Sequence, residues 1–204
     1  LPFREMLLTL AGDVEGKRAG GTLSPEQARR AWEALPAVGA ALVEHGPDLI
    51  DRFVPGEVLL RRTEGFPGPP GAARWQAKLR EIIRRGQEGT APVPGAGPDA
   101  PAPQADLFAQ VTQVLHAVSL GRPLLLAIDD LQWADGGTAA LLFHLGRRLA
   151  GSRILLVCAY RPEALQDPPD PEGLGRPLGS VLRELTREWG DVKVDLDRAD
   201  GRAF

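Results

Sequence analysis

Residues 124–130 have the sequence LLLAIDD, a run of five apolar residues that ends abruptly in two acids. A continuous apolar run of this length is typical of a strand that is buried on both faces of a parallel sheet. A second apolar run, ILLVCA, covers residues 154–159, and a shorter one covers residues 192–196. Helical patterns at 136–150 and 178–189 separate these runs. The alternation of strands and helices predicts a parallel α/β sheet with right-handed crossovers.

The first half of the chain has helical periodicity instead. Ser24 precedes Pro25 and stands three residues before Gln27, the arrangement of an N-cap with a capping box. The apolar stripe that follows is interrupted by Pro36, which leaves one kinked helix or two short helices open. Further helices are expected at 2–10, at 47–53, around 75–83 and at 106–120.

These patterns predict three parts of the chain. Residues 1–85 form a helical N-terminal part, residues 86–104 a flexible linker, and residues 105–204 an α/β part. The linker is predicted because residues 86–104 are rich in Gly, Pro and Ala and have no periodicity.

The composition limits the possible functions. The chain has 204 residues, a net charge of -3 and a pI of about 5.7, which argues against binding nucleic acid through bulk charge. It has one cysteine, Cys158, so it forms no internal disulfide, and it has no apolar run of the ~18 residues that span a bilayer. These features fit a cytoplasmic protein. Because the sequence begins at Leu1 without Met, we expect it to be an internal piece of a longer chain.

Polar residues follow both of the longer predicted strands. Asp129 and Asp130 come directly after the first strand, and Arg161 comes two residues after the second. In open α/β sheets, ligands bind outside the carboxyl ends of the strands. An apolar strand followed by two acids is the Walker B pattern, in which the first acid serves a Mg²⁺ ion and the second orients the attacking water. The alternatives are that the acids only cap the next loop and that Arg161 pairs with Glu163.

The wider string LLLAIDDLQWAD, residues 124–135, resembles the Walker B region of the STAND and AAA-type ATPase modules of large bacterial regulators, including MalT-like and LuxR-type transcription factors. The string RILLVCAYRPE, residues 153–163, resembles the next strand of that family, which ends in the arginine called sensor 1. Residues 1–8 and 195–204 resemble flanking stretches of the family more loosely. The resemblance implies a partial P-loop NTPase that binds ATP and Mg²⁺. It assigns Asp129 to the metal, Asp130 and Arg161 to catalysis, and all three to cofactor binding.

The sequence departs from the family at the phosphate-binding loop. No G-x-x-x-x-G-K followed by Ser or Thr occurs among the 204 residues. In the family this loop follows the first strand, and both come before the region where this sequence begins. In the sheet, that first strand is the central one and lies between the sensor-1 strand and the last strand. We therefore expect the strands at 124–128 and 154–159 to pair directly, and residues 192–196 to be separated from them.

The resemblance implies an ATP-binding, slowly hydrolysing switch within a larger regulator, inactive when this piece stands alone. Its partners would be other domains of the same chain and, on ATP binding, further copies of itself; DNA would be bound only through a separate output domain, and no membrane would be involved. One alternative is a degenerate, non-catalytic scaffold. Another is a metal-dependent hydrolase that uses Asp129 and Asp130 as ligands, with Asp195 as a further candidate.

The remaining conspicuous side chains have simpler interpretations. Trp133 is expected to pack in a core or interface rather than on an adenine, and Asp135 to cap the next helix. His144 is expected to be a satisfied or exposed structural histidine, and Cys158 an unreactive core residue. The arginines at 147–148 are expected to be a solvated pair at a helix end rather than a finger toward a neighbouring subunit.

Overall fold

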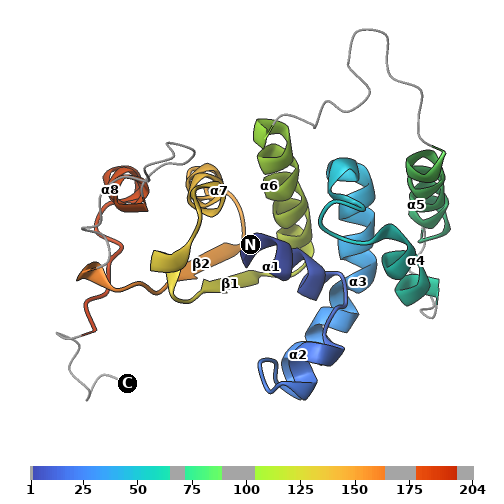
Figure 1. Ribbon diagram of the computed structural model, residues 1–204, viewed down its shortest axis with the longest axis horizontal. Helices are drawn as coiled ribbons and strands as arrows, with labels where there is room; N and C mark the ends of the chain where they lie inside the picture. Colours follow the sequence, from blue (N-terminus) through green and yellow to red (C-terminus); the bar gives the residue numbers. More distant parts are fainter. Residues whose placement is uncertain (1, 65–71, 89–103, 164–177, 197–204) are drawn as a thin grey trace, which may run out of the picture.

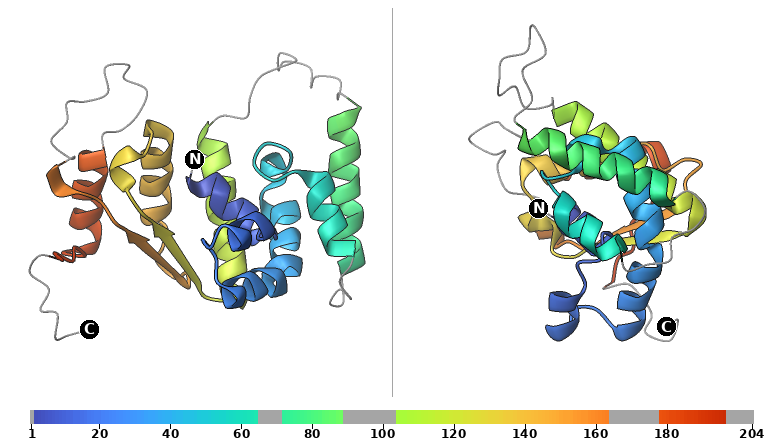
Figure 2. Two further views of the ribbon diagram at one scale, coloured as in Figure 1. Left: turned by 60° about the horizontal axis from the view of Figure 1, so that its bottom comes forward. Right: turned by 90° about the vertical axis from the view of Figure 1, so that its right-hand side faces the viewer.

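Two halves of the molecule lie side by side, one helical and one containing a small sheet (Figure 1). The structure is a computed structural model that describes residues 2–64, 72–88, 104–163 and 178–196. Within these ranges it contains eight α-helices, two 3-10 helices and one parallel sheet of two strands. Figure 2 shows the helices of the first half stacked beside the sheet, and α6 of that half contacts both strands.

The helical half confirms the helices predicted at 2–10, after Ser24, around 75–83 and at 106–120, and it adds two. The predicted segment at 47–53 is only the short 3-10 helix η1 (Pro47–Leu49). Two further helices, of five and nine residues, were not predicted from the sequence. The elements of this half are α1 (Pro2–Leu10), α2 (Glu15–Ala19), α3 (Pro25–His45), α4 (Gly56–Glu64), α5 (Ala72–Gln87) and α6 (Gln104–Gly121); α2 and α4 are the additions.

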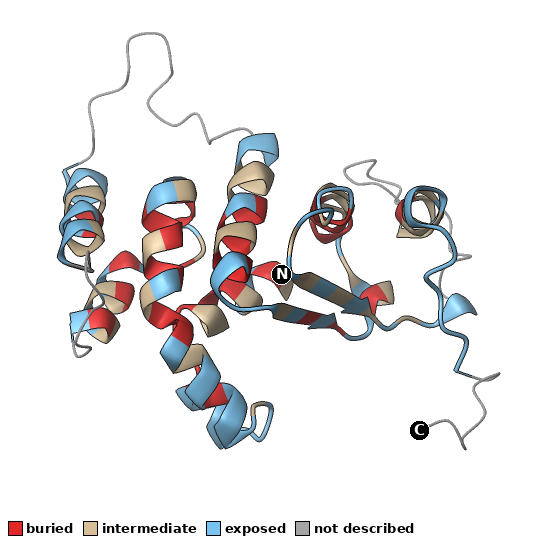
Figure 3. Cartoon of the chain, turned by 180° about the vertical axis from the view of Figure 1, so that it is seen from behind, coloured by how far each residue is buried: buried red, intermediate tan, exposed pale blue. Residues whose placement is uncertain are grey.

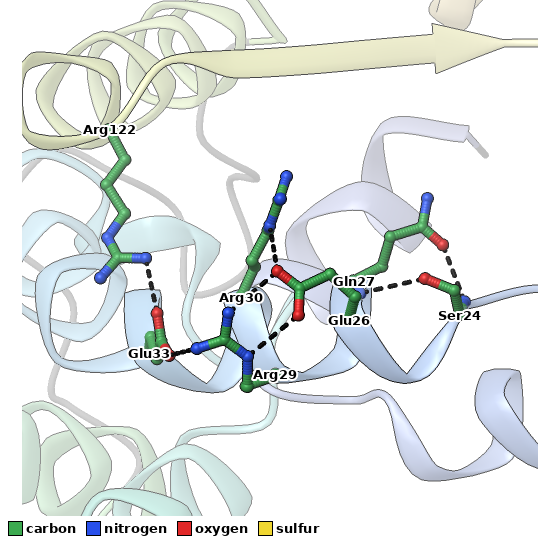
Figure 4. Close-up of polar contacts among 7 residues, drawn as sticks. All are labelled: Ser24, Glu26, Gln27, Arg29, Arg30, Glu33 and Arg122. Carbon is green, nitrogen blue, oxygen red and sulfur yellow. Dashed lines mark hydrogen bonds and ion pairs between the residues drawn. The ribbon is translucent and has the colours of Figure 1, made fainter.

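Helix α3 begins at the predicted capping box, which Figure 4 shows in detail. The Ser24 hydroxyl oxygen accepts a hydrogen bond from the backbone N–H of Gln27 at 3.1 Å, and the Gln27 side-chain oxygen accepts one from the Ser24 N–H at 2.7 Å. Pro36 lies inside a single helix of 21 residues. Leu35 and Leu42, on either side of it, are fully buried, so packing outweighs the hydrogen bond that a proline removes.

Ion pairs on α3 reach the sheet half. Glu26 pairs with Arg29 and Arg30 on the solvent face of the helix. Glu33 pairs with Arg29 and also with Arg122, whose Nη1 lies 3.0 Å from Glu33 Oε2 (Figure 4). Because Arg122 lies between α6 and the first strand, this contact ties the start of the sheet to the helical half.

The sheet consists of β1 (Leu124–Ile128) and β2 (Ile154–Cys158), paired in parallel and in register from end to end. The prediction that these two strands pair directly is confirmed. One face joins the core, where Leu126 and Ile128 are buried, and α6 contacts both strands. On the other face Leu125 is 66% exposed and Leu155 is 62% exposed, and Figure 3 shows exposed segments along both strands. The prediction of burial on both faces is therefore wrong for the described residues, because these side chains remain exposed although α1 lines a pocket beside Leu125.

Two helices follow the strands. The helix predicted at 136–150 is α7 (Gly136–Gly146), which ends earlier, and α8 (Leu178–Trp189) has the predicted bounds. The two helices pack closely at Gly146, where an added Cβ would lie 2.7 Å from Leu185 Cδ2. The Trp189 indole N–H donates to the Gly146 carbonyl oxygen at 3.0 Å, and Arg147 pairs with Glu188 at 3.1 Å.

The third predicted strand does not form. Residues 191–196 are described but irregular, and Val192, Val194 and Leu196 are all exposed. An alternating apolar pattern specifies a strand only where a neighbouring strand can pair with its backbone groups. The expectation that residues 192–196 stay apart from the sheet is confirmed, and their interpretation as a strand is wrong.

Two other expectations lie largely outside the described residues. The predicted linker at 86–104 overlaps the end of α5 and the first residue of α6, and its residues 89–103 lie outside the described part. Residues 197–204 of the loosely similar C-terminal stretch also lie outside it.

Candidate functional site

The structure brings the three predicted site residues to one edge of the sheet. Ile128 and Cys158, the last residues of the two strands, are register partners. Backbone bonds continue beyond them, from the Ala159 N–H to the Ile128 oxygen and from the Leu131 N–H to the Ala159 oxygen, both at 2.9 Å. The segments that carry Asp129, Asp130 and Arg161 therefore leave the sheet side by side.

The two acids have different backbone conformations. Asp129 follows β1 directly without a positive φ, and its Oδ1 accepts a hydrogen bond from the Asp130 N–H at 2.9 Å. Asp130 is left-handed, with φ 51° and ψ 42°, a conformation that Asp tolerates better than most residues. The chain bends there into the 3-10 helix η2 (Leu131–Trp133). Both acids are exposed, so they can offer carboxylate oxygens to a ligand.

A carboxamide, which the sequence did not single out, connects the two strand ends. Gln132 Nε2 donates to Asp130 Oδ1 at 2.7 Å, and Gln132 Oε1 accepts from the backbone N–H of Arg161 at 3.2 Å. The proximity of Gln132 to the acids is visible in the sequence. Its contact with a backbone group 29 residues away has no sequence signal, because any residue type supplies a backbone N–H.

A pocket of about 380 Å³ lies between α1 and β1 and ends at Asp129. Its wall includes Leu125 on the uncovered face of the sheet and Lys17 of α2. The Lys17 ammonium donates to the Thr9 hydroxyl at 2.6 Å and pairs with Glu5 at 3.2 Å. The sequence did not predict this pocket, because its lining comes from α1, α2 and β1, which are far apart in the chain.

The acids suit a magnesium ion held together with a phosphate ligand. Mg²⁺ prefers oxygen ligands, retains several waters and commonly takes only one or two carboxylates from the protein. The exposed carboxylate of Asp129 at the end of a fixed strand meets that need. Within the described ranges, no three His, Cys, Asp or Glu side chains gather into a metal-binding group. The hydrolase interpretation, which needed further ligands such as Asp195 beside Asp129 and Asp130, therefore gains no support from the described residues.

Several of the simpler interpretations are settled by direct contacts. Asp135 caps α7, because its Oδ1 accepts from the Thr138 N–H at 2.7 Å. Burial raises the pKa of the Cys158 thiol to about 11, which keeps it protonated and unreactive at neutral pH. Trp133 is 82% exposed, so its interpretation as a core residue is wrong, and the interface interpretation is untested. Arg161 forms no ion pair with Glu163, although both residues are described.

His144 differs from the expectation of a satisfied or exposed histidine. Its ring meets the Phe108 ring edge to face, with centroids 6.0 Å apart, and its Nε2 is buried without a hydrogen-bond partner among the described residues. Burial and, to a smaller extent, the nearby Arg148 charge lower the pKa of His144. Arg147 lies 5.4 Å above the Phe143 ring in addition to its pairing with Glu188, so it connects α7 to α8 rather than being only solvated.

Comparison with known families identifies the class of protein. Residues 22–157 match the family described as the AAA ATPase domain. Because this match covers more than half of the chain, the chain belongs to the AAA ATPase domain family, a group of P-loop ATPase-type modules whose members generally bind ATP with Mg²⁺. The matched range contains β1 and both acids but ends before Arg161. No curated protein and no solved structure matched the chain.

Among the described residues, no helix combines the length and apolar character that crossing a bilayer requires.

Proposed function

We propose that this chain is the Walker B and sensor-1 part of an ATP-dependent switch in a larger, STAND-type signalling or transcriptional regulator of the cytoplasm. The observation that carries the proposal is the juxtaposition of Asp129, Asp130 and Arg161 at the carboxyl edge of two paired parallel strands in a member of the AAA ATPase domain family. In parallel α/β sheets this edge is where ligands bind.

Each residue has a role that its position supports. A Mg²⁺ ion bound with ATP would neutralise phosphate charge. Asp129 would hold that ion with an exposed carboxylate fixed by the strand before it. Asp130 accepts a hydrogen bond from the attacking water and orients it. The Arg161 guanidinium recognises the γ-phosphate and so distinguishes ATP from ADP.

The phosphate cradle comes from outside these 204 residues, since they contain no glycine-rich loop with a following lysine. The uncovered sheet face, where Leu125 and Leu155 are exposed, supports a further element packed there in the complete switch. Other domains of the same polypeptide are the partners, assembly into oligomers follows ATP binding, and DNA is contacted only through a separate output domain. Slow hydrolysis then returns the switch to its resting state.

The test is nucleotide binding by the full-length protein, measured by calorimetry with ATP and ADP in the presence of Mg²⁺. Arg161→Ala should reduce the preference for ATP over ADP about 10- to 100-fold, the effect of one charged hydrogen bond. Asp129→Asn should weaken the Mg²⁺ dependence of binding, and Asp130→Asn should slow hydrolysis while retaining binding.

The matched control is Arg153→Ala at the opposite end of β2, where Arg153 donates to the Leu120 carbonyl oxygen at 3.2 Å. This variant should retain the wild-type preference for ATP. An equal loss in the Arg153→Ala and Arg161→Ala variants would contradict a specific role for Arg161.

A second candidate is a scaffold that keeps the fold without binding nucleotide, and the missing glycine-rich loop favours it. This candidate predicts that the full-length protein binds neither ATP nor ADP at millimolar concentration. The sequence encoded upstream of Leu1 gives an independent test, since a phosphate-binding loop there favours the switch.

A further inference from the structure

Gln132 lies between two of the residues to which the proposed function gives chemical roles. Its carboxamide is the described side chain that contacts both strand ends, through Asp130 on one side and the Arg161 backbone on the other. We propose that Gln132 is a positioning residue that fixes Asp130 and Arg161 relative to each other, so that the response to the γ-phosphate and the orientation of water are coupled. This inference rests on the proposed function.

The chemistry of the two contacts fixes how the carboxamide is oriented. An ionised carboxylate only accepts hydrogen bonds, and a backbone N–H only donates them. Gln132 must therefore turn its NH₂ group toward Asp130 and its oxygen toward Arg161, as observed. A carboxylate in place of the amide could only accept the hydrogen bond from the Arg161 N–H. An ammonium could only donate a hydrogen bond to Asp130.

The turn that carries Gln132 is itself anchored to the sheet. Leu131, the residue before it, is buried in the core, and its N–H donates to the Ala159 oxygen at 2.9 Å. Trp133, the residue after it, is mostly exposed. The backbone of η2 is thus held against the end of β2, while the Gln132 side chain spans the remaining distance to the Arg161 N–H. The backbone hydrogen bond between Leu131 and Ala159 already joins the two strand ends. The Gln132 carboxamide adds a second connection, which contacts Asp130 and Arg161 directly.

The coupling has a defined direction of effect. When Arg161 moves toward or away from a phosphate, the hydrogen bond from its N–H moves the Gln132 side chain. The hydrogen bond from Gln132 Nε2 then moves the Asp130 carboxylate. Without the bridge, each strand end responds separately. Gln132 therefore contributes to the discrimination between nucleotides without touching the nucleotide.

The first experiment examines the nucleotide-free protein, by following hydrogen exchange of the assigned Arg161 backbone amide by NMR in the full chain. Gln132→Ala and Gln132→Lys should speed exchange of this amide roughly three- to tenfold, because each removes the acceptor. Gln132→Glu should leave the exchange near the wild-type rate, because a carboxylate oxygen still accepts. Unchanged exchange in the Gln132→Ala variant would overturn the bridge.

The matched control is a second glutamine with the same pair of contacts in the helical half. Gln110 Oε1 accepts from the Asp48 N–H at 3.0 Å, and its Nε2 donates to Asp48 Oδ2 at 2.7 Å. Gln110→Ala should speed exchange at Asp48 and leave Arg161 unchanged. It should also leave nucleotide binding unchanged.

The second experiment measures the preference for ATP over ADP by calorimetry in the same variants. Gln132→Glu keeps the contact with Arg161 but places a negative charge beside Asp130, so it should reduce the preference about tenfold, as should Gln132→Ala. A wild-type preference that persists in every Gln132 variant would overturn the inference alone. A wild-type protein with no preference would overturn the proposed function, while the exchange experiment would still report on the bridge.

Discussion

The helical half and the sheet half use similar apolar residues in opposite ways. In the helical half the leucines of α3 are enclosed by neighbouring helices, and Leu35 and Leu42 have no exposed surface. In the sheet half, Leu125 and Leu155 occupy regular strands and are mostly exposed. Figure 3 shows the contrast, with buried residues lining the helix contacts and exposed residues along the strands. An apolar pattern thus determines which residues share a face, whereas a covering element determines whether that face is buried.

The largest expected difference between the halves comes from truncating one leucine in each. Leu42→Ala should lower the free energy of unfolding by about 2–5 kcal/mol, because it leaves a cavity in a closed core. Leu155→Ala should change it by less than about 0.5 kcal/mol, as is usual for exposed positions. Urea unfolding of the two variants and the wild type measures both changes. Equal costs would mean that the uncovered sheet face is buried in solution.

Two glycines at helix contacts, one in each half, should differ less in how much an alanine substitution destabilises the protein. A Cβ on Gly39 of α3 would lie 2.7 Å from the Trp75 ring, and a Cβ on Gly146 of α7 would lie 2.7 Å from Leu185 Cδ2. Gly39→Ala should destabilise by about 1–3 kcal/mol, because a packed ring cannot move aside. Gly146→Ala should cost less, because the tip of a leucine can rotate aside, whereas the gain in helix propensity of up to about 1 kcal/mol is available at both positions. Thermal unfolding compares the two, and a larger cost at Gly146 would contradict the argument.

Removing a helix cap should lower the free energy of unfolding by the same amount in both halves. Ser24 caps α3 and Asp135 caps α7, each through one hydrogen bond to a backbone N–H. Replacing either by alanine should lower the free energy of unfolding by about 1 kcal/mol, because a cap is a local interaction. Chemical unfolding measures both. The control variants Ser24→Asp and Asp135→Ser retain a capping oxygen and should stay near the wild type, so a loss in these variants as large as in the alanine variants would rule out capping as the cause.

The smallest expected effect is a pH dependence of the free energy of unfolding, which comes from His144 in the sheet half. The pKa of His144 is lowered from its ordinary value of 6.5 by burial and by the Arg148 charge. Between the lowered pKa and 6.5 the unfolded chain binds more protons than the folded one. This contribution to stability is therefore complete above pH 6.5 and declines as the pH falls below it.

The measurement is urea unfolding of the wild type and His144→Leu between pH 7.5 and 5.5. The wild type should lose more stability than the variant over this range, since the variant has no imidazole to protonate. The effect should be small because His144 is only partly buried. Parallel losses in the two proteins would show that His144 does not contribute.

Much of the local structure was predictable because its causes are local. The capping box of α3, the Asp135 cap and the positions of the two strands follow from residue types within a few positions of one another, whereas the direct pairing of these strands was expected only from the resemblance to the family. The irregular conformation of residues 192–196 was not predictable, because their alternating pattern forms a strand only beside a pairing partner, and the described residues do not provide one. The exposure of Trp133 and the buried nitrogen of His144 depend on which elements pack nearby, and neither can be deduced from neighbouring residues.

The sequence by itself determined the candidate chemistry: an apolar strand ending in Asp129 and Asp130, a second strand followed by Arg161, and no glycine-rich phosphate loop. Side-chain chemistry and strand periodicity are properties of short segments, so they can be deduced without coordinates. Only the tertiary structure decided that the two strand ends meet in register, that Gln132 bridges them, and that one face of the sheet is uncovered. These features depend on contacts between residues far apart in the chain, and the free energy of those contacts is set by packing rather than by local sequence.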